Sequence, residues 1–191
     1  MSQENSILMR LFGRPQGFMG RMGGSIMART NRNAAAWVVE LLDIQPNDSA
    51  LEVGFGPGVG IQLLARLAPE GYIAGLDSSG EMVAQAIARN WTNVAIGRVD
   101  LRHGFVERLP FEDSRFDKAL AINTLQVWPD VTAGLAEMRR TLKPGGKIAV
   151  AFTPYSGQVN RGLSEMLTLA GFVESRVVVA EPGFCTLAVK P

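Results

Sequence analysis

The chain has 191 residues, of which 47% are hydrophobic and 19% charged, and its formal net charge is +1. This balance is typical of one globular domain, and no window reaches the ~18 consecutive apolar residues of a membrane span. The single cysteine, Cys185, excludes an intrachain disulfide, and the single histidine, His103, excludes the usual Cys/His metal clusters. We therefore expect no metal and no stable membrane insertion. We also expect a cytoplasmic protein, because the first residues lack the pattern of a secretory signal.

Residues 1–32 differ in charge from the rest of the chain. They contain five arginines and one acidic residue, Glu4, whereas the remaining residues have a net charge of −3. A basic arm of this kind suits phosphate on a lipid, a nucleic acid or an anionic substrate, and it equally suits a solvated leader. Its methionines, phenylalanines and glycines also suit a lid that becomes ordered when a ligand binds. We expect an arm or lid over residues 1–32 and one domain over residues 33–191.

Hydrophobic periodicity predicts alternating helices and strands along residues 33–191. In chain order these are a helix at Asn33–Ile44, a strand at Ser49–Val53, a helix at Val59–Ala68, a strand at Tyr72–Asp77, a helix at Glu81–Asn90, strands at Val94–Arg98 and Phe116–Ile122, a helix at Val131–Leu142, a turn at Lys143–Gly146, a strand at Lys147–Phe152, a helix at Gly162–Ala170, and strands at Val173–Val179 and Phe184–Val189. This alternation predicts an α/β fold with a doubly wound, mainly parallel sheet of about seven strands. The last two strands are joined too tightly for a crossover helix, so they form an antiparallel hairpin.

The segment Leu51–Gly60, LEVGFGPGVG, places glycines at every second position directly after a predicted strand. A dinucleotide fingerprint needs a third small residue, but each register meets a larger side chain, Val59, Ile61 or Leu63. A P-loop needs a lysine, and the segment has none. Both phosphate-binding interpretations are therefore weakened, and the loop suits a ligand that lies against bare backbone.

Several linked motifs together resemble the class I S-adenosylmethionine-dependent methyltransferases, in particular the small-molecule branch with the ubiquinone and menaquinone biosynthesis methylases. They are Glu52 with Gly54, Gly56 and Gly58, the segment GLDSS ending at Ser79 with Met82 after it, Glu107–Phe111 before Ser114–Asp117, and Leu142–Gly146. The resemblance covers most of Asn33–Pro191 and implies a Rossmann-like methyltransferase domain there. It also implies S-adenosylmethionine as the cofactor.

The resemblance assigns roles to individual residues. Asp77 would accept hydrogen bonds from both ribose hydroxyls, Glu52 would lie near the methionine ammonium group, and Ser78 and Met82 would flank ribose and adenine. The implied cofactor-binding residues are Glu52, Gly54, Phe55, Gly56, Gly58, Asp77, Ser78, Met82, Phe105, Val106 and Asn123.

The chain departs from the family pattern after His103. Relatives commonly read Gly-Asp-Ala there, with the aspartate accepting from the adenine amino group, whereas this chain reads Gly104-Phe105-Val106. Two substitutes for that contact are open, a Phe105 ring packed on the adenine or a polar contact from the Val106 backbone, and a third interpretation places Phe105 in the core. His103 itself is expected to be a surface loop residue, and Asp117 is expected to brace the fold.

The implied reaction is an in-line displacement at a sulfonium methyl group, which depends mainly on positioning and needs no catalytic side chain. The acceptor would be a small-molecule or lipid-like compound, facing Gln126, Trp128 and Tyr155 beyond the strand ends. Nucleic acid is not expected, because no Asn-Pro-Pro-Tyr-like motif follows the fourth strand. Two alternatives stay open: a non-catalytic S-adenosylmethionine-binding protein and, less favoured, a nicotinamide-dependent oxidoreductase.

Overall fold

The computed structural model describes residues 32–191. The expected arm or lid at residues 1–32 lies, apart from its last residue, outside the described residues. Within residues 32–191 no helix is long and apolar enough to cross a membrane.

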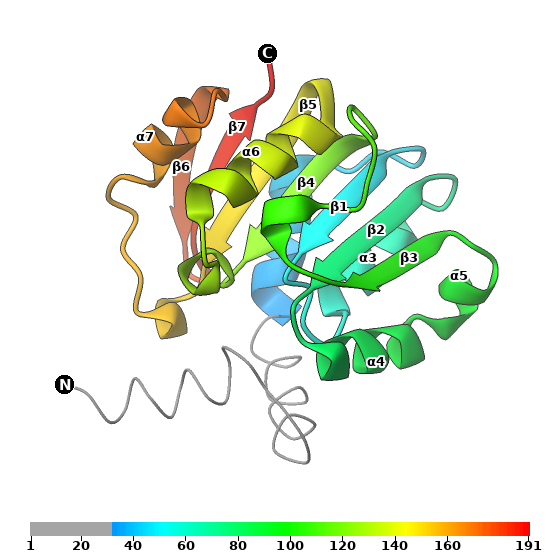
Figure 1. Ribbon diagram of the computed structural model, residues 1–191. Helices are drawn as coiled ribbons and strands as arrows, with labels where there is room; N and C mark the ends of the chain where they lie inside the picture. Colours follow the sequence, from blue (N-terminus) through cyan, green and yellow to red (C-terminus); the bar gives the residue numbers. More distant parts are fainter. Residues whose placement is uncertain (1–31) are drawn as a thin grey trace.

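The described chain folds around one seven-stranded sheet (Figure 1). Its strands are β1 (Ser49–Val53), β2 (Tyr72–Asp77), β3 (Val99–His103), β4 (Phe116–Ile122), β5 (Leu142–Phe152), β6 (Val173–Ala180) and β7 (Gly183–Val189). Their order is β3-β2-β1-β4-β5-β7-β6, with β1 to β5 parallel and β7 antiparallel to both of its neighbours. The predicted doubly wound sheet and its antiparallel C-terminal hairpin are confirmed.

Helices cover both faces of the sheet. The helical segments are residues 32–42, α3 (Val59–Leu67), α4 (Gly80–Arg89), α5 (Trp91–Ala95), α6 (Val131–Thr141) and α7 (Leu163–Leu169), with 3-10 turns η2 (Val106–Arg108), η3 (Leu125–Val127) and η4 (Pro154–Ser156). In Figure 1, α6 and α7 lie on the near face and α3 on the far face.

Alternation along the strands divides the core into two clusters. Ala50 of β1 packs with Leu42 and with Leu64 of α3. Leu51 packs on the opposite face with Leu135 of α6. Glu52 therefore shares the face of Ala50, toward α3, and this placement decides the environment of its carboxylate.

The strand predicted at Val94–Arg98 is wrong. Val94 and Ala95 belong to α5, which begins because the Asn90 carbonyl accepts from the backbone N–H of Asn93 (2.9 Å) and of Val94 (3.1 Å). The edge strand starts at Val99 instead, where the chain pairs with Ile73.

Two further predictions concern the start of β5 and the neighbouring strand β4. The turn expected at Lys143–Gly146 falls within the bounds of β5 as an irregularity of the strand: Gly145 has φ +77°, and the pairing with β4 shifts register between Leu142 and Lys147. Gly145 N–H donates to the Lys190 carbonyl (2.8 Å) and Lys190 N–H to the Gly146 carbonyl (2.9 Å). The bracing role of Asp117 is confirmed: its carboxylate accepts from Ser49 N–H (2.9 Å) and from Lys143 Nζ (2.8 Å), joining three segments.

Candidate functional site

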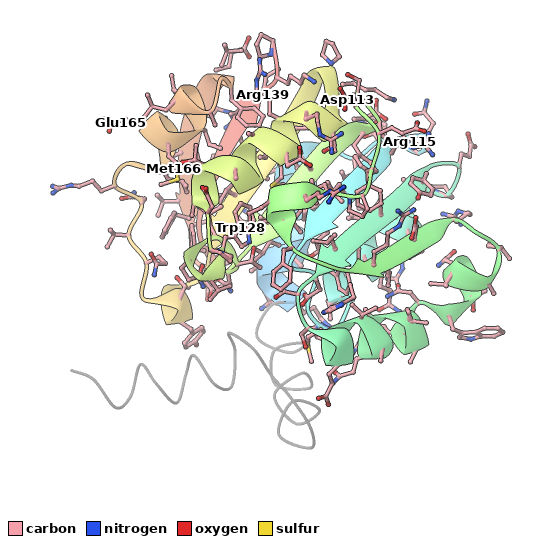
Figure 2. All side chains as sticks on the ribbon, viewed as in Figure 1. Asp113, Arg115, Trp128, Arg139, Glu165 and Met166 are labelled. Atoms are coloured by element: carbon pink, nitrogen blue, oxygen red, sulfur yellow. The ribbon has the colours of Figure 1, made fainter. Side chains whose placement is uncertain are left out.

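A pocket opens at the carboxyl ends of β1, β2 and β4, on the side of the sheet where parallel α/β folds bind ligands. Most of the residues that the resemblance implies line it: Glu52, Gly54, Phe55, Gly56, Asp77, Ser78, Met82, Phe105, Val106, Asn123 and Trp128. Figure 2 shows Trp128 between β4 and α6. Among residues 32–191 no group of His, Cys, Asp and Glu side chains could hold a metal ion.

The glycine loop after β1 is shaped by contacts on two sides. Gly54 has φ +72°, and a Cβ there would overlap the side chain of Thr124, which follows β4. Gly58 has φ +80° and lies outside the pocket lining, where a Cβ would come within 2.7 Å of the Ala86 Cβ in α4. Gly54 thus permits a close approach at the pocket, whereas Gly58 permits helix packing.

Asp77 ends β2 and is held by the backbone around it. Its Oδ2 accepts from Gly56 N–H and its Oδ1 from Ser79 N–H, both at 2.8 Å. Burial raises the pKa of Asp77, and these two hydrogen bonds and the nearby His103 partly offset that effect. Each oxygen keeps a free lone pair, so the carboxylate is oriented and still able to accept two hydroxyl donors. The N-cap of α4 is Ser79, whose Oγ accepts from Met82 N–H (3.4 Å).

Glu52 is the second acid of the pocket and is only 4% exposed. A Cβ on Gly60 would overlap both of its carboxylate oxygens, so α3 lies directly against this side chain. Burial, and next the charge of Asp77, raise the pKa of Glu52 to about 8, although a hydrogen bond from the Ile61 backbone acts in the opposite direction. Its Oε2 is buried and has no hydrogen-bond partner within residues 32–191. A cationic donor would satisfy that oxygen.

The wall formed by β2, α4 and η2 is mostly apolar. Met82 is 2% exposed and Val106 is 4% exposed, and both line the pocket. Phe105 is 53% exposed, so its interpretation as a core residue is wrong, and its ring is free to face a planar ligand. His103 is exposed at the end of β3, outside the lining, with its Nε2 3.1 Å from the Ser78 carbonyl oxygen.

The three residues expected to face the acceptor do not all line the pocket. Trp128 lines the pocket and packs on α6, where a Cβ on Gly134 would come within 2.7 Å of its ring. Gln126 is turned aside, and its Nε2 donates to the Asn123 carbonyl (2.8 Å). Tyr155 is 80% exposed and does not line the pocket.

Sequence reasoning missed several residues of the pocket lining, among them Gly60, Thr124 and Ala35. Gly60 has a signal, because it continues the two-residue glycine spacing of the loop. Thr124 and Ala35 have none, because their contribution depends on how β4 and the helix at residues 32–42 pack beside the loop.

Comparisons with known proteins agree with this geometry. Residues 51–150 match the family model described as a methyltransferase domain. An uncharacterized methyltransferase of Bacillus subtilis, YdaC, is 31% identical over 182 residues, which cover 89% of this chain and 98% of that protein. The ubiquinone/menaquinone biosynthesis C-methyltransferase of Geotalea daltonii is 31% identical over 121 residues, 63% of this chain and 52% of that relative, so the match spans about half of its length.

Solved structures show the same fold. Phosphoethanolamine N-methyltransferase 2 of Haemonchus contortus, in complex with S-adenosyl-L-methionine, superposes with a TM-score of 0.70 at 17% identity, over 83% of this chain and 52% of that one. The chain belongs to the methyltransferase domain family, and it is an S-adenosylmethionine-dependent methyltransferase.

Proposed function

We propose that the pocket holds S-adenosylmethionine with its ribose on Asp77 and its ammonium group on Glu52. The observation that carries this proposal is the pair of buried acids, one with two oriented oxygens and the other with an oxygen that lacks a partner within residues 32–191. Gly54, Phe55 and Gly56 would lie along the methionine part.

The purine would lie against the wall at the end of β2. Ser78, Met82, Phe105 and Val106 line the pocket there. The aspartate that relatives use for the adenine amino group is absent, and the exposed ring of Phe105 supports stacking instead. We propose Gly58 as a packing residue rather than a ligand, because a side chain there would meet α4.

We infer that the acceptor is a small-molecule or lipid-like compound. The lining residues that follow β4 are apolar or uncharged: Asn123, Thr124, Val127, Trp128 and Pro129. When bound, the cofactor supplies a methyl group on a positively charged sulfur, which a nucleophile can attack with little acid-base assistance. These side chains would orient an apolar acceptor and exclude water, so positioning supplies the catalysis. The relative named for ubiquinone and menaquinone biosynthesis supports a lipid-like acceptor.

We also propose that residues 1–32 act with the methyltransferase domain of residues 33–191 as a cover for this acceptor end. The support is Ala35, which lines the pocket close to the point where the two parts of the chain join. Limited proteolysis of the full chain, with and without S-adenosylhomocysteine, tests this proposal. Cleavage of the arm at the same rate in both states would contradict it. Separately, we propose that the protein is cytoplasmic and has no nucleic-acid partner.

The acceptor class is tested by transfer of a tritiated methyl group from S-adenosylmethionine. The probes are 1,4-naphthohydroquinone and, for comparison, a single-stranded oligonucleotide. We expect label in the organic extract only. Label in the oligonucleotide, or in neither probe despite measurable cofactor binding, would count against an apolar quinol-like acceptor.

A further inference from the structure

We propose that Asn123 is a positioning residue that joins the two loops at the acceptor end of the pocket. One loop leads from β4 to α6 through residues 123–130, and the other leads from β5 to α7 through residues 153–162. The inference rests on the proposed function only in assigning these loops to the acceptor, because the contacts described below do not depend on it.

Both polar atoms of the Asn123 amide contact one residue. Its Oδ1 accepts from Thr153 N–H at 2.8 Å, and its Nδ2 donates to Thr153 Oγ1 at 3.0 Å. Thr153 is 4% exposed, so water competes poorly for these hydrogen bonds. Asn123 N–H also donates to the Ala151 carbonyl (2.9 Å), which carries the pairing of β4 and β5 one residue past Ile122. The side chain and the backbone of Asn123 therefore fix the same two strand ends.

The backbone of Asn123 turns the chain toward β1. Its φ of +55° is left-handed, a conformation that asparagine tolerates better than most residues. The next residue, Thr124, consequently lies over Gly54 and brings its Oγ1 within 3.3 Å of the Val53 carbonyl, to which it donates. Residues 123 and 124 thus connect three strand ends, those of β1, β4 and β5.

The first turn of each loop is held by a backbone carbonyl of Asn123 or Thr153. The Thr153 carbonyl accepts from Ser156 N–H (3.0 Å) and from Ser156 Oγ (2.7 Å), which forms η4. The Asn123 carbonyl accepts from Gln126 Nε2 (2.8 Å) at η3. Since the amide is engaged by Thr153, Asn123 would act through the loops it anchors and not as a side-chain ligand of the cofactor.

Limited trypsin digestion of the full chain tests this role at Arg161, an exposed residue of the loop after β5. Asn123→Ala and Thr153→Val should speed cleavage after Arg161 about tenfold, because each removes hydrogen bonds that restrain this loop. Asn123→Asp and Thr153→Ser keep polar atoms that can hydrogen-bond between residues 123 and 153, so cleavage after Arg161 should stay as slow as in the native chain. Asn47→Ala, at an exposed asparagine in the turn before β1, is the matched control and should leave the rate unchanged.

The affinity for S-adenosylhomocysteine separates positioning from ligand binding. It should change less than about threefold in Asn123→Ala, because neither amide atom would be a cofactor ligand. A tenfold loss of this affinity with unchanged cleavage at Arg161 would overturn the proposal and make Asn123 a ligand. Faster cleavage at all arginines alike, or no change at Arg161 in Thr153→Val, would also overturn it. If Asn123→Ala does not fold, Thr153→Val and Thr153→Ser decide the question. The cleavage readout uses neither cofactor nor acceptor, so the proposed function can fail without affecting it.

Discussion

Glu52 and Asp77 line one pocket from neighbouring strands, and the negative charge of Asp77 raises the pKa of Glu52. Burial is the larger cause, and together they bring that pKa to about 8. Glu52 is therefore mostly protonated at neutral pH when no cation lies beside it. A ligand ammonium group would favour the ionised form, so binding and proton release should be linked.

The first prediction is this proton release. Calorimetric titration of S-adenosylhomocysteine at about pH 7, in two buffers of different ionisation enthalpy, should show about one proton released per site. Glu52→Gln cannot ionise and should release none. Equal proton counts for the two proteins would contradict the placement of the ammonium group at Glu52.

The second prediction concerns stability without ligand. The ordinary pKa of a glutamate side chain is 4.5, and burial raises the pKa of Glu52 to about 8 in the folded chain, so the folded state binds more protons between these values. The stabilisation from this protonation is fully present below about pH 4.5 and is lost as the pH rises through about 8. Denaturant unfolding should show a steeper fall in the free energy of unfolding from about pH 5 to 8 for the native chain than for Glu52→Gln. A parallel decline would contradict it, since the other titrating groups are shared.

The third prediction compares two helical glycines. Gly60→Ala in α3 would press a methyl group against the Glu52 carboxylate and should destabilise the fold by about 1–3 kcal/mol. Gly80→Ala in α4 meets no atom within 4 Å, so it should be neutral or stabilise by up to about 1 kcal/mol. Thermal unfolding of both variants measures the difference. Equal effects would mean that Glu52 does not lie against α3.

The fourth prediction concerns Trp128. Gly134→Ala places a methyl group 2.7 Å from its ring, so the indole should move from α6 and its emission should shift to longer wavelength. Fluorescence in a background with Trp37→Phe and Trp91→Phe isolates the signal. The affinity for S-adenosylhomocysteine is measured in Trp128→Phe, because a Cβ at residue 134 would also come within 2.9 Å of Val106, which we assign to the purine. It should change less than about threefold, because we assign Trp128 to the acceptor. A large loss of that affinity would place Trp128 at the cofactor.

The fold and the cofactor end of the pocket could be predicted because their signals are local. The spacing from Glu52 to Asp77 defines strand, loop, helix and strand within one short segment. The edge strand β3 was missed because its two apolar residues, Val99 and Leu101, alternate with the charged residues Asp100 and Arg102, and so short an alternation is a weak signal. The apolar residues just before it were taken for the strand instead.

The acceptor end was predicted less well for a different reason. Trp128 was placed at the pocket, but Gln126 and Tyr155 were not distinguished from it, because the turns η3 and η4 decide which side chains face inward. The contacts of Thr124 with Gly54 and of Asn123 with Thr153 join segments far apart in the sequence. Such contacts have no signature in a single chain.

The most direct test of the central claim is calorimetric binding of S-adenosylhomocysteine to the native chain and to Asp77→Asn. The native chain should bind it saturably, and loss of a charged acceptor should weaken binding by about 1.5–3 kcal/mol, which is roughly 10- to 150-fold. Glu165→Gln, an exposed acid on α7, is the matched control and should bind like the native chain (Figure 2). Equal affinity for Asp77→Asn and the native chain, with both proteins folded, would contradict the assignment of Asp77 to the ribose and with it the proposed site.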